Sequence, residues 1–145
     1  MSRLLNISHR PAACFAPETT VREAVSTMVR DHVGAAAVVG PGGTLLGMFS
    51  ERDLMTRVID RGLSPRTATV GEAMTRKPVT VAAGATLEEA LEIMVTGGFR
   101  HLPILEDGRV IAMATVRRVL KHKLDEEREE LESVVSFFTA DGIGG

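Results

Sequence analysis

Apolar residues recur twice along this chain at the spacing of an amphipathic helix. In both stretches they follow the i, i+3, i+4, i+7 order: Val21, Ala24, Val25 and Met28, then Leu87, Ala90, Leu91 and Met94. A threonine precedes each stretch, at Thr20 and Thr86, and a glutamate follows it three residues later. This pair is typical of a capping box, in which hydroxyl and carboxylate bond free amides at a helix start. The pattern therefore predicts two helices.

The same elements follow each predicted helix. A short apolar run (residues 35–39 and 102–105), a glycine-containing turn and a second apolar run (residues 45–49 and 110–114) indicate a hairpin. A further helix is expected near Glu51 and near Val116. The copies superpose at an offset of 66 residues, and at 65 after a one-residue deletion in the turn. The unit is strand, helix, strand, strand, helix.

Neither copy is long enough for a comfortable core, because domains of about 60 residues bury only around 60% of their surface. We therefore expect an α/β fold of two pseudo-twofold-related β-α-β-β-α repeats packed through their sheets, with ligand clefts between them. The predicted divisions are residues 1–63 for the first repeat with its approach segment, 64–124 for the linker and second repeat, and 125–145 for an acidic helix and flexible tail.

Ser50 and Asp53 stand three residues apart where the first hairpin meets its second helix. One interpretation is a capping box at that helix start. The other is a sugar site, since a carboxylate accepts two hydrogen bonds from a vicinal diol and the hydroxyl adds a third. Both can hold, because a carboxylate has about four acceptor positions. The second repeat has Thr115 and Arg118 there, and a guanidinium cannot accept from a diol.

Basic residues gather in the second repeat. Arg100 and His101 enter its first hairpin strand, and Arg117 begins its second helix. Phosphate at this end and a sugar diol at the acidic end would suit a nucleotide. The alternative is a solvated strand edge with a structural imidazole at His101.

Three signatures, repeated in order, resemble a tandem pair of CBS domains, a Bateman module. They are Met74-Thr75 leading into residues 78–81, the strand at residues 100–104, and the segment at residues 47–54. The resemblance covers about residues 7 to 124. It implies a regulatory, non-catalytic module that binds adenosyl compounds between its repeats: AMP first, with ATP, ADP, NAD or S-adenosylmethionine as other ligands.

The resemblance also implies roles for particular residues. Ser50 and Asp53 match the hydroxyl and carboxylate that hold the ribose, and Arg100 and His101 match the basic pair that reaches the phosphates. Arg117 could join that pair. The adenine is expected against Met48 and the chain around Phe15 and Ala16. No catalytic cofactor is implied.

Composition narrows the function further. A net charge of −2 and the absence of Trp and Tyr argue against nucleic acid as the main partner. A single cysteine excludes an internal disulfide, and four dispersed histidines predict no metal site. No apolar run approaches the roughly 20 residues of a membrane-spanning helix. With no secretory signal in the first 15 residues, we expect a cytoplasmic protein without a membrane partner.

The last predicted helix differs from the others. Residues 121–132 carry six acids against three Lys or Arg, and Leu124, Leu131 and Phe138 recur at intervals of seven. This predicts a partial seam for a neighbour, interrupted by Glu127. The alternative is a solvated helix that covers its own module. Residues 141–145 are expected to fray.

Three functions remain open at this stage. The first is a ligand-sensing module that dimerises through its CBS helices and signals by a change of repeat or dimer orientation. The second is a structural adaptor with vestigial nucleotide sites. The third, an enzyme, lacks a nucleophile-and-base constellation in the sequence.

Overall fold

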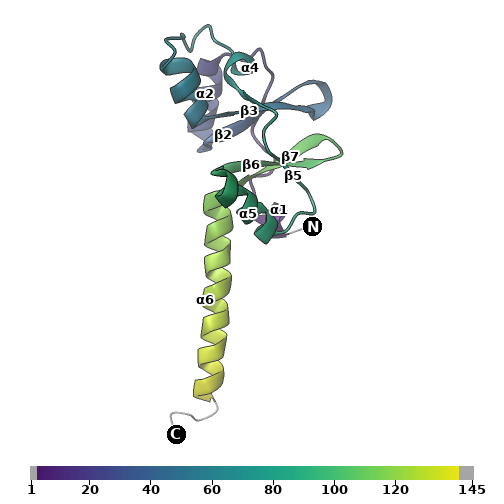
Figure 1. The fold of residues 1–145 in the computed structure, drawn as a ribbon, viewed down its shortest axis with the longest axis vertical. Coiled ribbons are helices and arrows are strands. Elements are labelled where there is room, and N and C mark those ends of the chain that lie inside the picture. The colour runs from purple at the N-terminus through teal and green to yellow at the C-terminus, as the bar shows by residue number, and fades with distance from the viewer. Residues whose placement is uncertain (1–2, 141–145) are drawn as a thin grey trace.

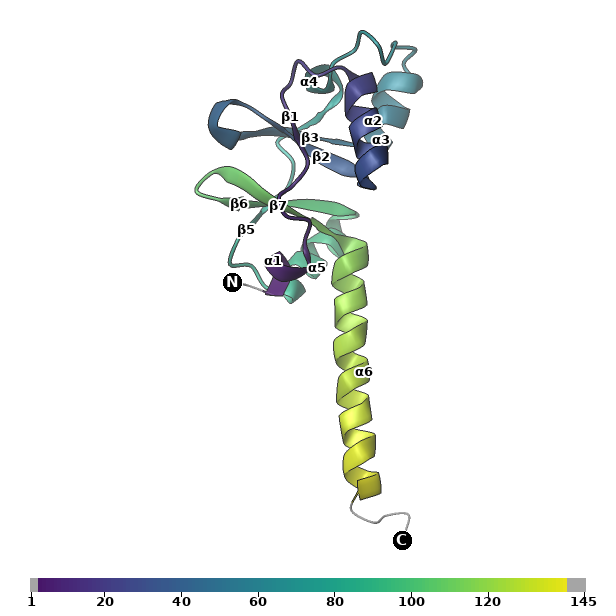
Figure 2. The ribbon, with the colours of Figure 1, turned by 180° about the vertical axis from the view of Figure 1, so that it is seen from behind.

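The computed structural model describes residues 3–140 of the chain. It contains two small α/β units, one above the other, and a long helix that leaves the second unit (Figures 1 and 2). Residues 141–145, which were expected to fray, lie outside the described part.

The first unit has a four-stranded sheet in the order β1-β2-β3-β4. Its elements are β1 (Cys14–Phe15), α2 (Val21–Asp31), β2 (Ala35–Val39), the turn η1 (Pro41–Gly43), β3 (Leu45–Ser50), α3 (Glu51–Asp53) and the π-helical η2 (Leu54–Ile59). Strand β2 runs parallel to β1 and antiparallel to β3.

The second unit repeats this order around a three-stranded sheet, β5-β6-β7. Its elements are β5 (Val81–Ala82), α5 (Leu87–Gly97), β6 (His101–Glu106), β7 (Arg109–Thr115) and α6 (Val116–Ala140). The predicted α/β fold of two strand-helix-strand-strand-helix repeats is thus confirmed. The Thr86–Glu89 capping box is complete, whereas at the first helix the structure shows Thr20 accepting from the Glu23 amide.

Three short elements that the sequence pattern did not predict join the units crosswise. Helix α1 (Arg3–Ile7) supplies Leu4 and Leu5 to the core of the second unit. Helix α4 (Val70–Ala73) packs in the first core, and β4 (Thr75–Arg76) pairs with β3. The domain boundary at residue 63 stays a prediction. Helix α1 precedes this boundary but packs in the core of the second unit, and α4 follows it but packs in the core of the first.

The two sheets meet through β2 and β7, and an isolated bridge joins Thr44 to Arg109 between the hairpin turns. On its other side each sheet packs against its own helices. Phe49 is fully buried in the first core, and Leu102 and Ile104 are fully buried in the second. This packing places the end of β3 and the start of β6 at the joint between the units.

Candidate functional site

The end of β3 carries the Ser50–Asp53 pair, and the pair forms the capping box of α3. Ser50 Oγ accepts from the Asp53 amide at 3.3 Å. Asp53 Oδ2 accepts from the Ser50 amide at 2.9 Å and from Ser50 Oγ at 3.0 Å. Asp53 is 4% exposed. A buried carboxylate needs several donors and a cation to offset lost hydration, and the rest of the first unit supplies them.

Thr75 and Arg57 hold the second oxygen of Asp53. Thr75 Oγ1, on β4, donates to Asp53 Oδ1 at 3.0 Å, and Arg57 Nε lies 3.4 Å from the same atom. Arg57 Nη1 also donates to the Met74 carbonyl at 3.1 Å. About four acceptor positions exist on a carboxylate, and these contacts use them. A sugar diol would therefore have to replace the hydroxyl of Ser50 or Thr75 in order to reach Asp53.

His101 begins β6 and meets the first unit at Gly34 and Glu51. A Cβ added to Gly34 would lie 3.2 Å from Glu51 Oε1 and 3.3 Å from His101 Cε1. The Glu51 amide donates to the Gly34 carbonyl at 3.0 Å, which fixes Glu51 beside Ser50. The structure therefore places Glu51, at the end of β3, near His101 of the second unit.

The pKa of His101 is lowered from its ordinary value, mainly by burial. Glu51 acts in the opposite direction, while His9 and Arg100 lower the pKa further. Burial disfavours the imidazolium because the charged form loses hydration. The side chain is therefore mostly neutral at pH 7.

Three other predicted site residues are Met48, Arg100 and Arg117. Met48 pairs with Thr75 across β3 and β4. Arg100 is exposed and its carbonyl accepts from the Val116 amide, and Arg117 is exposed one residue later. The ligand contacts expected of these three residues stay predictions.

Phe15 and Ala16 lie elsewhere. Phe15 is opposite Val38 near the far end of β2, whereas Ser50 is opposite Ala35 at the beginning of that strand. Strand β2 also separates β1 from β3, and Phe15 packs against the first core. The register thus puts Phe15 at a distance from Asp53, and β4 occupies the neighbouring place. The adenine contact expected from Phe15 and Ala16 stays a prediction.

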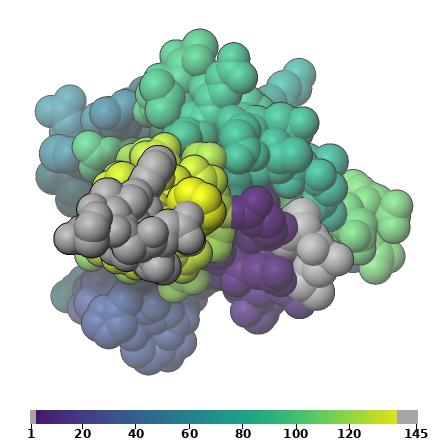
Figure 3. Space-filling view, turned by 90° about the horizontal axis from the view of Figure 1, so that it is seen from below, coloured from purple at the N-terminus to yellow at the C-terminus, as the bar shows by residue number. Residues whose placement is uncertain are grey.

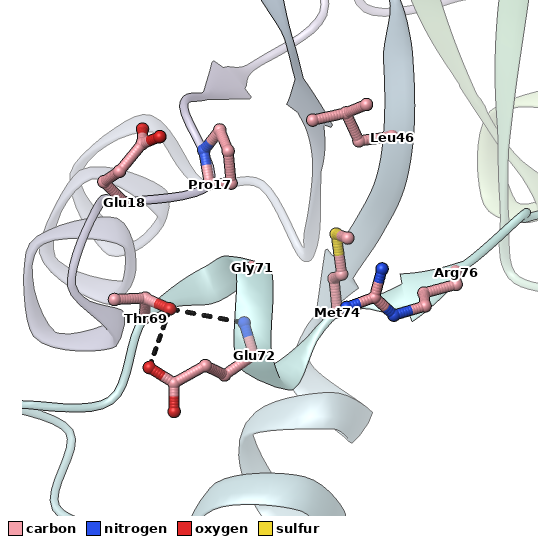
Figure 4. Close-up of a pocket in the computed structure, with 8 residues that line it drawn as sticks. All are labelled: Pro17, Glu18, Leu46, Thr69, Gly71, Glu72, Met74 and Arg76. Atoms are coloured by element: carbon pink, nitrogen blue, oxygen red, sulfur yellow. Dashed lines mark hydrogen bonds between the residues drawn. The ribbon is translucent and has the colours of Figure 1, made fainter.

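A pocket of about 390 Å³ opens beside the end of β3, between α2 and η2. Ser50, Glu51 and Gly34 line it together with apolar side chains such as Phe49 and Leu54. A larger hollow, of about 480 Å³, lies around α4 and β4 (Figure 4). It carries Glu18 and Glu72, and its Thr69 is hydrogen-bonded to Glu72. The larger hollow also carries Arg76. The smaller pocket is lined by residues of the first repeat alone, and neither lining includes Asp53 or His101.

The pseudo-equivalent place in the second unit is basic. Thr115 Oγ1 accepts from the Arg118 amide, and Arg118 Nη1 donates to the Ile7 carbonyl. His9 forms an isolated β-bridge with Met113, in the same way that Thr75 pairs with Met48 in the first unit. The pKa of His9 is lowered mainly by burial and further by the charge of Arg118. A histidine and an arginine thus replace the threonine and aspartate, and this pair offers no carboxylate to a sugar.

Sequence reasoning missed four contributors to these sites: Arg57, Thr75, Glu51 and His9. Arg57 follows Asp53 by four residues in a helical stretch, a spacing that signals an ion pair. His9 and Thr75 carry no such local signal, because their partners lie far away in the chain. Glu51 is recognised only when His101 is placed beside it.

Among the described residues 3–140, no three side chains of the His, Cys, Asp or Glu type come close enough together to hold a metal ion. In that same range no helix has the length and apolar character needed to cross a membrane.

Comparison with known proteins gives a consistent result. The family profile of the CBS domain matches residues 5–60 and 70–125. The CBS domain-containing protein CBSCBSPB2 of Arabidopsis thaliana is 35% identical over 122 residues, which are 84% of this chain and 23% of that protein. CBSX3, a mitochondrial CBS domain-containing protein of the same plant, is 33% identical over 83% of this chain and 60% of its own length. The chain spans less than two thirds of these relatives.

Solved structures match over nearly their whole length. The CBS-domain protein ATU1752 of Agrobacterium tumefaciens has a TM-score of 0.74 and 32% identity, and the match covers 83% of this chain and 95% of that one. CBSX2 in complex with AMP has a TM-score of 0.73 and 25% identity, with 88% and 99% covered. Hypoxic Response Protein I, solved with two coordinated zinc ions, has a TM-score of 0.74 and 27% identity, with 82% and 97% covered.

Proposed function

Because this chain belongs to the CBS domain family as a tandem pair of CBS domains, we propose that it is a regulatory module that binds an adenine nucleotide, AMP first, between its repeats. The meeting of the Ser50–Asp53 end of β3 with His101 at Gly34 and Glu51 carries the proposal. The complex of the related CBSX2 with AMP supports this ligand class. CBS pairs are generally regulatory modules without catalytic activity, and we propose no reaction here.

The ribose would bind through Asp53. Its two hydroxyls donate to the carboxylate in place of Thr75 Oγ1 and Ser50 Oγ, which now occupy it. Such charge-assisted bonds are stronger than neutral ones. Met48, on the strand next to β4, supplies an apolar surface for the adenine.

The phosphate would bind at the second repeat. Arg100 and Arg117 are exposed cations there, and His101 becomes a third when it is protonated. Glu51 repels a phosphate, so the ligand competes with Glu51 for His101. Binding then releases Thr75 on one side of the joint and alters the Glu51–His101 contact on the other. The Glu51–His101 interaction lies between the two repeats, so we propose that the ligand changes their relative orientation.

The first test is calorimetric titration of the purified chain with AMP, ADP, ATP, NADH and S-adenosylmethionine. We expect saturable one-to-one binding of at least one adenine nucleotide. Asp53 is fully satisfied by protein donors in this structure, and this observation favours the rival function, a structural adaptor with vestigial sites. No heat and no thermal shift with any of the five ligands would establish the adaptor.

A sharper prediction concerns pH and His101. A bound phosphate stabilises the imidazolium, so binding takes up a proton, and AMP affinity should rise by up to about tenfold per pH unit as pH falls from 8 toward 6.5. His101→Gln should lower the affinity and remove this dependence. A pH profile that is identical in the variant would contradict the phosphate role.

In the absence of ligand, protonation of His101 has an unfavourable effect: it lowers the free energy of unfolding. The lowered pKa of His101 means that the unfolded chain takes up the proton first. The free energy of unfolding contributed by this group is therefore constant above about pH 6.5, the unfolded value. It decreases as pH falls below that value toward the folded one, and His101→Gln should remove this decrease.

We also propose that the module is a homodimer through its CBS helices. Large apolar side chains are exposed at pseudo-equivalent positions of the two repeats: Val29, Met55 and Ile59 in the first, and Val95, Leu120 and Leu124 in the second. Monomers seldom expose such matching surfaces without a partner. The proposed compartment is the cytoplasm, although the relative CBSX3 is mitochondrial.

A further inference from the structure

The distal half of α6 stands clear of both α/β units. Figures 1 and 2 show the helix leaving the foot of the second unit with no other element beside its outer turns, and Figure 3 looks along it from the far end. The helix spans Val116–Ala140. Most of the stability of a helix in a protein comes from the packing of its amphipathic face. Its outer turns therefore require another surface.

Helix α6 carries an apolar stripe at the spacing of a coiled coil, and we expect the other surface to pack on this stripe. Leu120, Leu124, Leu131 and Val134 occupy a and d positions of one heptad frame, with Leu124 and Leu131 at a. Leu124 is 59% exposed and Leu131 is 64% exposed. The neighbouring e and g positions carry charge at Lys121, Lys123, Arg128 and Glu130. A stripe this narrow suits a two-stranded seam rather than a larger bundle.

Ion pairs in the N-terminal half of α6 fix which side of the helix faces its own unit. Glu126 pairs with Arg3 of α1, and Lys123 Nζ lies 3.1 Å from Glu88 Oε1 of α5. Val119 is fully buried on the same side. Figure 3 shows α1 next to the foot of α6. Because these contacts turn one side of α6 toward its own unit, the leucine stripe faces outward.

We infer that the occupant is α6 of a second copy, parallel and in register. Leu120 and Leu124 belong both to the heptad stripe and to the exposed face proposed above for the homodimer. An antiparallel pair of α6 helices would hold the two bodies at opposite ends and leave the face on the bodies uncovered. The parallel pair covers both surfaces at once, so this inference extends the proposed dimer to the outer turns of α6.

Glu127 gives the seam its specificity. It takes a d position between Leu124 and Leu131, so in the parallel pair it faces Glu127 of the second copy. Arg128, an exposed residue at e, flanks it and offsets the two carboxylates. A charged residue inside a seam costs stability but penalises other registers. In the antiparallel pairing Glu127 would instead face a leucine.

Cysteine cross-linking tests the geometry in the full chain. With Cys14→Ser as background, E127C should form an intermolecular disulfide rapidly in mild oxidant, because d positions face each other in a parallel pair. The matched control is E129C, which lies at the outward f position and should cross-link much more slowly. Equal rates for the two variants would overturn the parallel, in-register pair.

Sedimentation equilibrium and circular dichroism test the energetics. E127L should tighten the dimer by about tenfold or more, since it completes the apolar seam. L131E should weaken the dimer and reduce helical signal, while Ile59→Glu, on the body face, should weaken the dimer without loss of α6 helix. If L131E changes neither measurement, or if the species is larger than a dimer, the inference is wrong. AMP titration of L131E shows separately whether ligand binding persists.

Discussion

Asp53→Ala should lower the free energy of unfolding by about 3 kcal/mol and weaken AMP binding by at least about 100-fold. The stability loss follows because the buried carboxylate accepts from the Ser50 amide, Ser50 Oγ and Thr75 Oγ1 and pairs with Arg57. Without it, the carboxylate half of the α3 capping box is lost and several donors lose their acceptor. The binding loss follows because alanine cannot accept from a ribose.

Urea denaturation and calorimetry measure these two effects independently. Thr75→Val is the matched control: it removes one donor to Asp53 and leaves the carboxylate, so it should cost only about 1 kcal/mol. It should not weaken AMP binding, because the ribose would replace this hydroxyl. If Asp53→Ala destabilises the fold but leaves AMP affinity unchanged, the carboxylate serves as a cap and the ribose assignment is wrong.

Gly47→Ala should cost about 2–4 kcal/mol of unfolding free energy, through overpacking. A Cβ at this position would lie 2.5 Å from Met74 Sδ and 2.7 Å from the Thr75 carbonyl oxygen. The thioether can rotate away, but the carbonyl belongs to the backbone of β4. Strand β4 must therefore move from β3, and Thr75 moves with it from Asp53.

Gly84→Ala is the control for this substitution. A Cβ on Gly84 would meet no atom within 4 Å, so its effect on unfolding should lie within about 0.5 kcal/mol. Both variants are compared by urea denaturation at one pH. A Gly47→Ala protein as stable as the control would show that β4 does not pack against β3 as described.

The repeat architecture was predictable because its signals are local. The helix stripes, the Thr86–Glu89 capping box and the hairpin turns each involve residues within a few positions of one another. Helices α1 and α4 were missed because five and four residues are too short to display a periodicity. What places α1 in the second core is the burial of Leu4 and Leu5 against residues far along the chain.

The candidate site shows the same division. The three-residue spacing of Ser50 and Asp53 predicted the capping box, and the structure forms it. The spacing could not reveal that Thr75, 22 residues later, donates to the same carboxylate. Nor could it reveal the parallel register of β1 on β2, which places Phe15 opposite Val38 while Ser50 lies opposite Ala35.

The amino-acid sequence by itself determined the two copies, their element order and the chemical difference between Asp53 and Arg118, because short-range spacing and side-chain type suffice for these. Tertiary structure decided which segments complete each core, which donors occupy Asp53 and that His101 meets Glu51. Those outcomes depend on burying apolar surface from distant parts of the chain together, and no local pattern encodes the partners that such burial brings into contact.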